Sequence, residues 1–139
     1  MDLSAFGASW IFLAKSQLAF AQGNYLEAIS IADKMIDYMR QFKLNQFLAD
    51  LLLLNGKAHW ALGERDQARQ ALDQARQAAE ALGSRRMMWQ ILGALAEVET
   101  DSAQAGEFRI QAQAIVQDIA NHTPPELRQG FLAMQVVGI

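Results

Sequence analysis

The sequence has no cysteine, only two prolines, and charged side chains at only 19% of its 139 positions. The absence of cysteine excludes a disulfide scaffold and a thiol-ligated metal site. The two prolines stand together at Pro124 and Pro125, and the rest of the chain is rich in alanine, leucine and glutamine. This composition favours helices along nearly the whole chain.

No block of a single charge sign is present, since 12 basic and 15 acidic residues are interspersed and give a net charge of −3. Even the arginine-rich stretch 64–86 carries nearly as many acids as arginines. There is therefore no basic field to attract nucleic acid or anionic lipid. No apolar run approaches the ~18 residues of a membrane span. We expect no direct nucleic-acid partner and no membrane partner.

The N-terminal stretch 5–14 is mostly apolar and precedes Ala19-Phe20-Ala21, which is similar to a signal-peptide cleavage site. A secretory signal needs a positively charged start, whereas this chain starts with Asp2. We therefore expect no signal peptide, and we expect a cytoplasmic protein.

With 52% hydrophobic residues the chain can bury a core, and we expect one all-α domain over 1–139. Apolar residues recur every three or four positions, which predicts helices. Seven helices are expected. The first four are 3–21, a second between Gly23-Asn24 and a break at 42–45, 46–62 and 64–82. The last three are 85–99, a sixth from the capping segment 100–102 to about 121, and a seventh that ends at about 134.

Different residue types mark the expected helix ends. Gly23 and Gly63 suit the left-handed conformation that stops a helix, whereas the break at 42–45 has neither glycine nor proline. Thr100-Asp101-Ser102 supplies capping side chains. Thr123-Pro124-Pro125-Glu126 is typical of a capping box with proline at the first helical position.

The same spacing predicts which side of each helix is buried. The expected inward residues are Tyr25, Ala28, Ile29, Ala32, Met35, Ile36 and Met39; Ala68, Leu72, Ala75, Ala79 and Leu82; Ala105, Phe108, Ala112, Ile115 and Ile119; and Leu127, Phe131 and Leu132. On the outer sides, Arg69, Asp73 and Arg76 are spaced for mutual ion pairs, and Arg128 and Gln129 should face solvent.

Stretches beginning at Gly23 and Gly63, forty residues apart, can be superposed, and each glycine is followed five positions later by alanine, at Ala28 and Ala68. A third copy places Ala105 at an offset of 37 residues from Ala68. A period in this range is typical of stacked helical hairpins.

Trp89-Gln90-Ile91-Leu92-Gly93 reproduces the W-x2-L-G signature of tetratricopeptide (TPR) repeats, and Gly56 stands at the same place in the second copy. The chain thus resembles a run of three TPR repeats. This resemblance implies an α-solenoid of three antiparallel helical hairpins plus a C-terminal capping helix, about seven helices, with repeats at about 9–43, 46–82 and 85–120 and the cap at about 124–134.

At the glycine and alanine positions of the repeat the two helices of a hairpin should approach closely. The first repeat departs from this pattern because Ser16 replaces the helix glycine. The third departs because Arg109 stands where Ala32 and Leu72 stand in the others. Either Arg109 emerges at a solvated edge, or its helix is rotated slightly toward Phe108.

Residues 123–132 resemble the PELR-x-x-FL ending of large bacterial signalling regulators. Those proteins join an ATPase, a kinase or cyclase, or a DNA-binding module to a C-terminal TPR array. The resemblance implies either the end of a longer protein or a stand-alone relative.

TPR arrays expose a concave face lined by the first helix of each hairpin, which implies a groove for a peptide or amphipathic helix. The partner-binding residues that the resemblance implies are Trp10, Leu13, Gln17, Phe20, Asp50, Leu53, Lys57, Trp60, Met87 and Gln90, with Ala94 and Glu97 beside them. The alternative for Trp10 and Trp60 is burial in the core. The clamp by which one TPR subtype grips a C-terminal carboxylate is absent, because its places hold Leu13, Gln17, Leu54, Met87 and Ile91.

Chemistry-bearing residues are sparse. No second histidine or carboxylate stands at metal-ligand spacing beside His59, which we expect between paired helices, and His122 should lie on a surface loop. No phosphate loop and no nucleophile–base pair is apparent. We therefore expect no enzyme, no metal and no cofactor. Arg85-Arg86 is expected at a helix start, where a partner carboxylate would offset the unfavourable helix dipole.

The first helix is apolar nearly all round at Trp10-Ile11-Phe12-Leu13, which predicts burial on more than one side, under preceding repeats or another copy. Our hypothesis is a non-enzymatic TPR module of a bacterial signalling or transcriptional regulator. It would bind a protein or peptide in its groove, form a homodimer through the first helix, or both. The alternative is a small-ligand-sensing effector domain of a multidomain regulator.

Overall fold

The computed structural model describes residues 3–138, and it describes side chains over 10–133. Within this range the protein is all-α and has no strands. The seven helices are α1 (Leu3–Ala21), α2 (Tyr25–Gln41), α3 (Leu48–Ala61), α4 (Arg65–Leu82), α5 (Arg85–Val98), α6 (Ser102–Asn121) and α7 (Pro125–Gly138). The expected helices are present, with most ends within two residues of the prediction, but α7 continues past the predicted end near 134.

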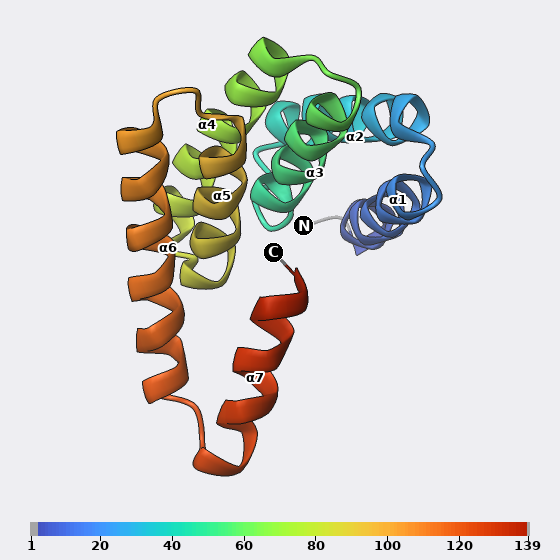
Figure 1. The fold of residues 1–139 in the computed structure, drawn as a ribbon. Coiled ribbons are helices and arrows are strands. Elements are labelled where there is room, and N and C mark those ends of the chain that lie inside the picture. The colour runs from blue at the N-terminus through green and yellow to red at the C-terminus, as the bar shows by residue number, and fades with distance from the viewer. Residues whose placement is uncertain (1–2, 139) are drawn as a thin grey trace.

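The first six helices form three hairpins, α1–α2, α3–α4 and α5–α6, in which neighbours in sequence pack against each other. The hairpins stack because α2 packs on α3 and α4 packs on α5. The first helices are also in contact from one hairpin to the next, α1 with α3 and α3 with α5, and they lie on the inner side of a curved array (Figure 1). The predicted all-α solenoid of helical hairpins is thereby confirmed.

Left-handed glycines end three helices, two of them at the expected Gly23 and Gly63. Gly23, Gly63 and Gly83 have φ values of 80°, 79° and 65°. The predicted break at 42–45 uses Lys43 instead, at φ 54°. Leu44 N then donates to Met39 O at 2.8 Å, as Glu64 N donates to His59 O at 2.9 Å after a glycine. The backbone bond that closes the helix end is thus the same with lysine, at a conformational cost that glycine avoids.

Side-chain caps begin α5 and α6. Ser84 Oγ accepts from Met87 N at 3.3 Å, and Asp101 Oδ1 accepts from Ala103 N at 3.0 Å, as the capping segment predicted. The predicted capping box before α7 is wrong in one respect. Thr123 Oγ1 donates to Ile119 O at 2.7 Å and so ends α6, while α7 begins at Pro125.

The core follows the predicted stripes, with fully or largely buried residues such as Ala32, Leu72 and Phe108 on the faces between helices. Two expected core residues are exceptions. Leu82 is 50% exposed and Leu127 is 60% exposed. Leu82 is the last residue of α4, where the chain already turns away toward Gly83. On the outer face of α4, Arg76 pairs with Glu80 at 3.6 Å and not with Asp73.

The two signature glycines differ in their surroundings. A Cβ on Gly56 would lie 2.7 Å from Leu72 Cγ, so α3 and α4 approach as closely as predicted. A Cβ on Gly93 would meet nothing within 4 Å. The counterpart of Leu72 in the third hairpin is Arg109, which is exposed, so no side chain fills the space facing Gly93. The expectation of close packing is therefore wrong at Gly93.

The last helix is attached differently from the others. Of the described helices, only α6 packs against α7, whereas α3 and α5 each contact both helices of the preceding hairpin. Arg128 is partly buried and donates from Nε to Ala120 O at 2.9 Å, contrary to its predicted solvent position. Figure 1 shows α7 turning back beside the far end of α6. The expected cap therefore covers part of α6 and leaves α5 without contact from α7.

Candidate partner-binding groove

A groove crosses the inner side of the array where α1, α3 and α5 meet. Its cavity of about 220 Å³ is lined by Gln17 and Phe20 of α1, Asp50, Leu53, Leu54 and Lys57 of α3, and Arg86, Met87 and Gln90 of α5. Seven of the ten residues predicted for partner binding are among these. These residues lie one or two turns apart on α1, α3 and α5, the first helices of the three hairpins. Stacking of the hairpins therefore brings them together.

The remaining three predicted residues lie elsewhere. Leu13 is buried within the core under α2 and does not line the groove. Trp10 is 60% exposed, so the core alternative is wrong for it, and it does not line this cavity. Trp60 is partly buried and packs against the core, with Arg65 above its ring, 5.4 Å from the centroid, and it does not line this cavity.

The floor of the groove is apolar and packed against the rest of the protein. Leu53 and Met87 are almost fully buried. Phe20 packs edge-on against Tyr25 with ring centroids 5.3 Å apart, an arrangement that aromatic pairs favour. Because these side chains are held by neighbours within the protein, the surface that they offer is preorganised for an apolar group of a ligand.

The rim of the groove is polar. Arg86 Nη2 donates to Asp50 Oδ2 at 3.5 Å, and the Asp50 carboxylate is largely buried while the Arg86 side chain is exposed. Gln90 Nε2 donates to Arg86 O at 3.2 Å and is thereby oriented along α5. Among the side chains that the structure describes, no ion pair involves Lys57, which is half-buried.

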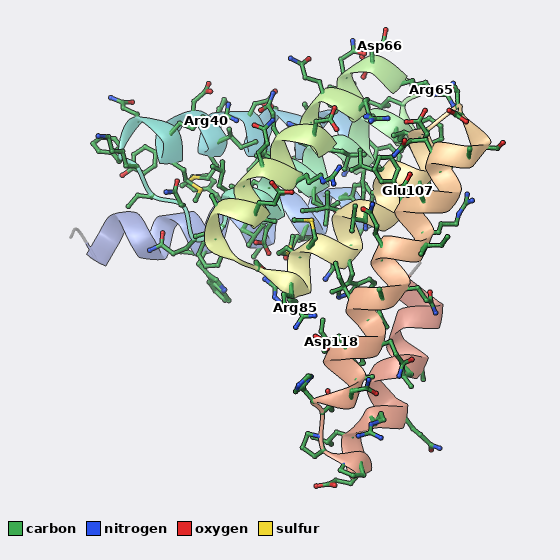
Figure 2. The ribbon with its side chains drawn as sticks, turned by 90° about the vertical axis from the view of Figure 1, so that its left-hand side faces the viewer. Arg40, Arg65, Asp66, Arg85, Glu107 and Asp118 are labelled. Carbon is green, nitrogen blue, oxygen red and sulfur yellow. The ribbon has the colours of Figure 1, made fainter. Side chains whose placement is uncertain are left out.

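Leu54 and Arg86 line the groove but were not predicted as partner-binding residues. The signal for Arg86 was present in Arg85-Arg86 at a helix start, where a partner carboxylate would offset the unfavourable helix dipole. Both arginines have one: Arg86 pairs with Asp50, and Arg85 forms an ion pair with Asp118 of α6. Figure 2 shows Arg85 and Asp118 close together where α5 begins.

A second cavity, of about 410 Å³, lies among α2, α3 and α4 and has a mainly polar lining. Its residues include His59, whose Nδ1 is 3.2 Å from Glu64 Oε1, and Asn55, whose Nδ2 donates to Asp33 Oδ1 at 2.5 Å. His59 lies at the junction of α3 and α4, as predicted. In the part of the chain that is described, no three histidine or carboxylate side chains are grouped to hold a metal ion.

The outer surface of α1 and α2 is apolar. Trp10, Ile11, Phe12, Leu18 and Leu26 are all large and exposed. Beside them is a mainly apolar cavity of about 360 Å³, lined by Phe12, Ile31, Lys34, Met35 and Tyr38. The first helix was predicted to be buried on more than one side, but within this chain only Leu13 of the four residues from Trp10 to Leu13 is buried.

An ion-pair cluster ties the second and third hairpins together. The Arg69 guanidinium bonds to Asp73 on its own helix at 3.3 Å and to Glu99 at the end of α5, and it lies 5.6 Å from the centre of the Phe108 ring. The hydrogen bond from Arg69 holds the pKa of the Glu99 carboxyl below its ordinary value, helped by the Asp101 amide. It also raises the pKa of Arg69.

No described helix is long and apolar enough to cross a membrane. Comparison with protein-family models, with characterised proteins and with solved structures found no match to this chain.

Proposed function

We propose that this chain is a non-enzymatic TPR-type interaction module of a cytoplasmic bacterial signalling or transcriptional regulator. It acts as a scaffold that binds a peptide or an amphipathic helix in the groove between α1, α3 and α5. The observation that carries the proposal is the convergence of seven predicted partner-binding residues on one groove. An apolar floor with a polar rim is the arrangement by which helix-in-groove sites bind.

The size of the groove favours a segment of a protein over a metabolite. At about 220 Å³ it is below the ~300–1,000 Å³ of most small-molecule sites. It can accept one or two side chains at a time from a segment that continues along the three helices. Such a segment gains affinity from the backbone and side chains outside the cavity as well.

Peptide selection tests this proposal. A random peptide library would be selected on the immobilised protein, and enriched peptides would be measured by calorimetry against two variants. Gln17→Trp fills the groove from an exposed position on α1, whereas Gln113→Trp places the same bulk on the exposed side of α6. We expect about tenfold weaker binding for Gln17→Trp only. Failure to enrich any peptide, or equal binding by both variants, would contradict groove binding.

The second candidate is a small-ligand effector domain, favoured by the polar cavity of about 410 Å³ beside His59 and Asn55. Its volume is within the range of metabolite sites. A thermal-shift screen of metabolites distinguishes the two, because a ligand at ~100 times its Kd adds about 2.7 kcal/mol to the stability of the folded state. A shift that Asn55→Ala abolishes and Gln17→Trp leaves unchanged would favour the effector function.

A further inference from the structure

The sign of charge in the groove is opposite to that of the whole molecule. The ionisable side chains in its lining are Lys57, Arg86 and Asp50, so the lining carries one net positive charge, whereas the chain has a net charge of −3. Potentials of interacting surfaces are usually complementary in sign. A partner segment that fits this groove is therefore one with an acidic group.

Within the groove, the two cations differ in what they can still bind. Arg86 already donates to the Asp50 carboxylate. Lys57 has no ion-pair partner among the described side chains. Its neighbours at helical spacing on α3 offer none, since the residues three and four positions away are Leu53, Leu54, Trp60 and Ala61. Lys57 is thus a partly buried side chain in the lining of the groove whose charge is available to a carboxylate of a ligand.

The spacing of residues along α3 sets which part of the groove each of them lines. Asp50 and Lys57 are two helical turns apart, about 10 Å at 1.5 Å per residue, and both line the cavity. Asp50 and Arg86 neutralise each other at one end, the leucines occupy the middle, and Lys57 stands at the other end. A single acidic side chain would therefore be bound at the Lys57 end, with apolar side chains one turn away along the segment.

We propose that the groove is specific for a protein segment that carries an acidic side chain next to apolar ones, and that Lys57 binds this acid. The inference rests on the proposed groove binding and names the chemistry of its partner. Phe20, Leu53 and Met87 receive the apolar side chains. Lys57 determines which apolar segments bind, because an apolar segment with a basic residue in this place would bring two cations together.

The test compares peptide selection on four proteins: the native chain, Lys57→Met, Lys57→Glu and Lys15→Glu. Lys57→Met keeps most of the unbranched side chain and removes its charge. Lys15→Glu makes the same reversal at an exposed position of α1 outside the groove. Circular dichroism spectra and thermal unfolding of each variant establish that it is folded. Selected peptides are then measured with their acid replaced by the matching amide, and with a free or amidated C-terminus.

For the native chain and Lys15→Glu, we expect apolar peptides enriched in one aspartate or glutamate, with a loss of about fivefold or more when the acid becomes an amide. Lys57→Met should bind both forms equally, and Lys57→Glu should enrich a basic residue in the same place. Enrichment of apolar peptides without an acid, an unchanged preference in Lys57→Glu, or dependence on the C-terminal carboxylate alone would overturn the inference while groove binding stands. If no peptide is enriched on any protein, both proposals fail.

Discussion

Gly56 of α3 and Leu72 of α4 face each other so closely that a Cβ on the glycine would lie 2.7 Å from Leu72 Cγ and 3.3 Å from Ala68 O. Ser16 and Gly93 occupy the corresponding places in the first and third hairpins. These three positions have different surroundings, and they allow matched tests of how each hairpin is packed.

Replacing the two glycines by alanine should change stability in opposite directions. Alanine is favoured over glycine in a helix interior by ~1 kcal/mol. At Gly93, where a Cβ meets nothing within 4 Å, Gly93→Ala should therefore raise the free energy of unfolding by about 1 kcal/mol. At Gly56 overpacking against buried Leu72 costs ~1–3 kcal/mol, so Gly56→Ala should lower it by about 1 kcal/mol. Urea unfolding of both variants measures this, and a gain at Gly56 would show that α3 and α4 separate without cost.

Ser16→Ala should stabilise the protein. The Ser16 side chain is fully buried, and its Oγ has no hydrogen-bond partner among the described residues. An unsatisfied buried hydroxyl costs ~1–3 kcal/mol, and alanine removes it without adding volume. We expect about 1 kcal/mol or more of added stability in urea unfolding.

The control for this substitution is Ser30→Ala on the exposed side of α2. It gains only the difference in helix propensity, up to ~0.5 kcal/mol. Equal gains at Ser16 and Ser30 would mean that the buried hydroxyl is satisfied in solution.

Because of Glu99, the free energy of unfolding should change with pH in the acidic range. Its folded-state pKa is lowered by the hydrogen bond from Arg69, so its contribution is fully present above the unfolded-state pKa of the carboxyl. The contribution is lost as pH falls through the lower, folded-state pKa. Glu99→Gln should therefore be less stable than the native protein near neutral pH, and the difference in the free energy of unfolding should shrink as pH falls through the lowered pKa of Glu99.

Unfolding by urea across this pH range measures the effect, and Glu107→Gln, an exposed position on α6, is the control. If the difference in the free energy of unfolding between the native protein and Glu99→Gln stayed constant with pH, it would contradict the ion pair with Arg69.

The exposed apolar surface of α1 should mediate self-association. Leu18 is 58% exposed and Trp10 is 60% exposed, and apolar surface in patches of this kind commonly marks an interface. We expect light scattering at micromolar concentration to give a dimer mass for the native chain and a monomer mass for Leu18→Glu.

Ile110→Glu places the same charge on another exposed apolar residue, on α6, and should leave the dimer intact. A native monomer at micromolar concentration would exclude the homodimer, and it would leave groove binding unaffected.

The groove illustrates how far the sequence predicts a site. Gln17, Asp50 and Lys57 could be assigned from the repeat alignment, because the first helices of stacked hairpins present equivalent faces. The position of Trp10 could not be assigned, because its burial depends on what covers α1. In the structure Trp10 is 60% exposed. For Arg86 the sequence indicated that a carboxylate partner would be favourable, but the identity of that carboxylate depends on how α3 and α5 are placed side by side.

The sequence by itself determined the helices and their order of pairing, because apolar spacing, glycine turns and capping residues act within a few residues along the chain. The left-handed Gly23 and Gly63 and the cap at Asp101 follow from such local chemistry. Tertiary structure alone decided that Lys57 has no ion-pair partner among the described side chains, that Gly93 faces open space, and that α6 is the one described helix on which α7 packs. These depend on distances between residues far apart in the chain, which the packing of whole helices sets and no local pattern encodes.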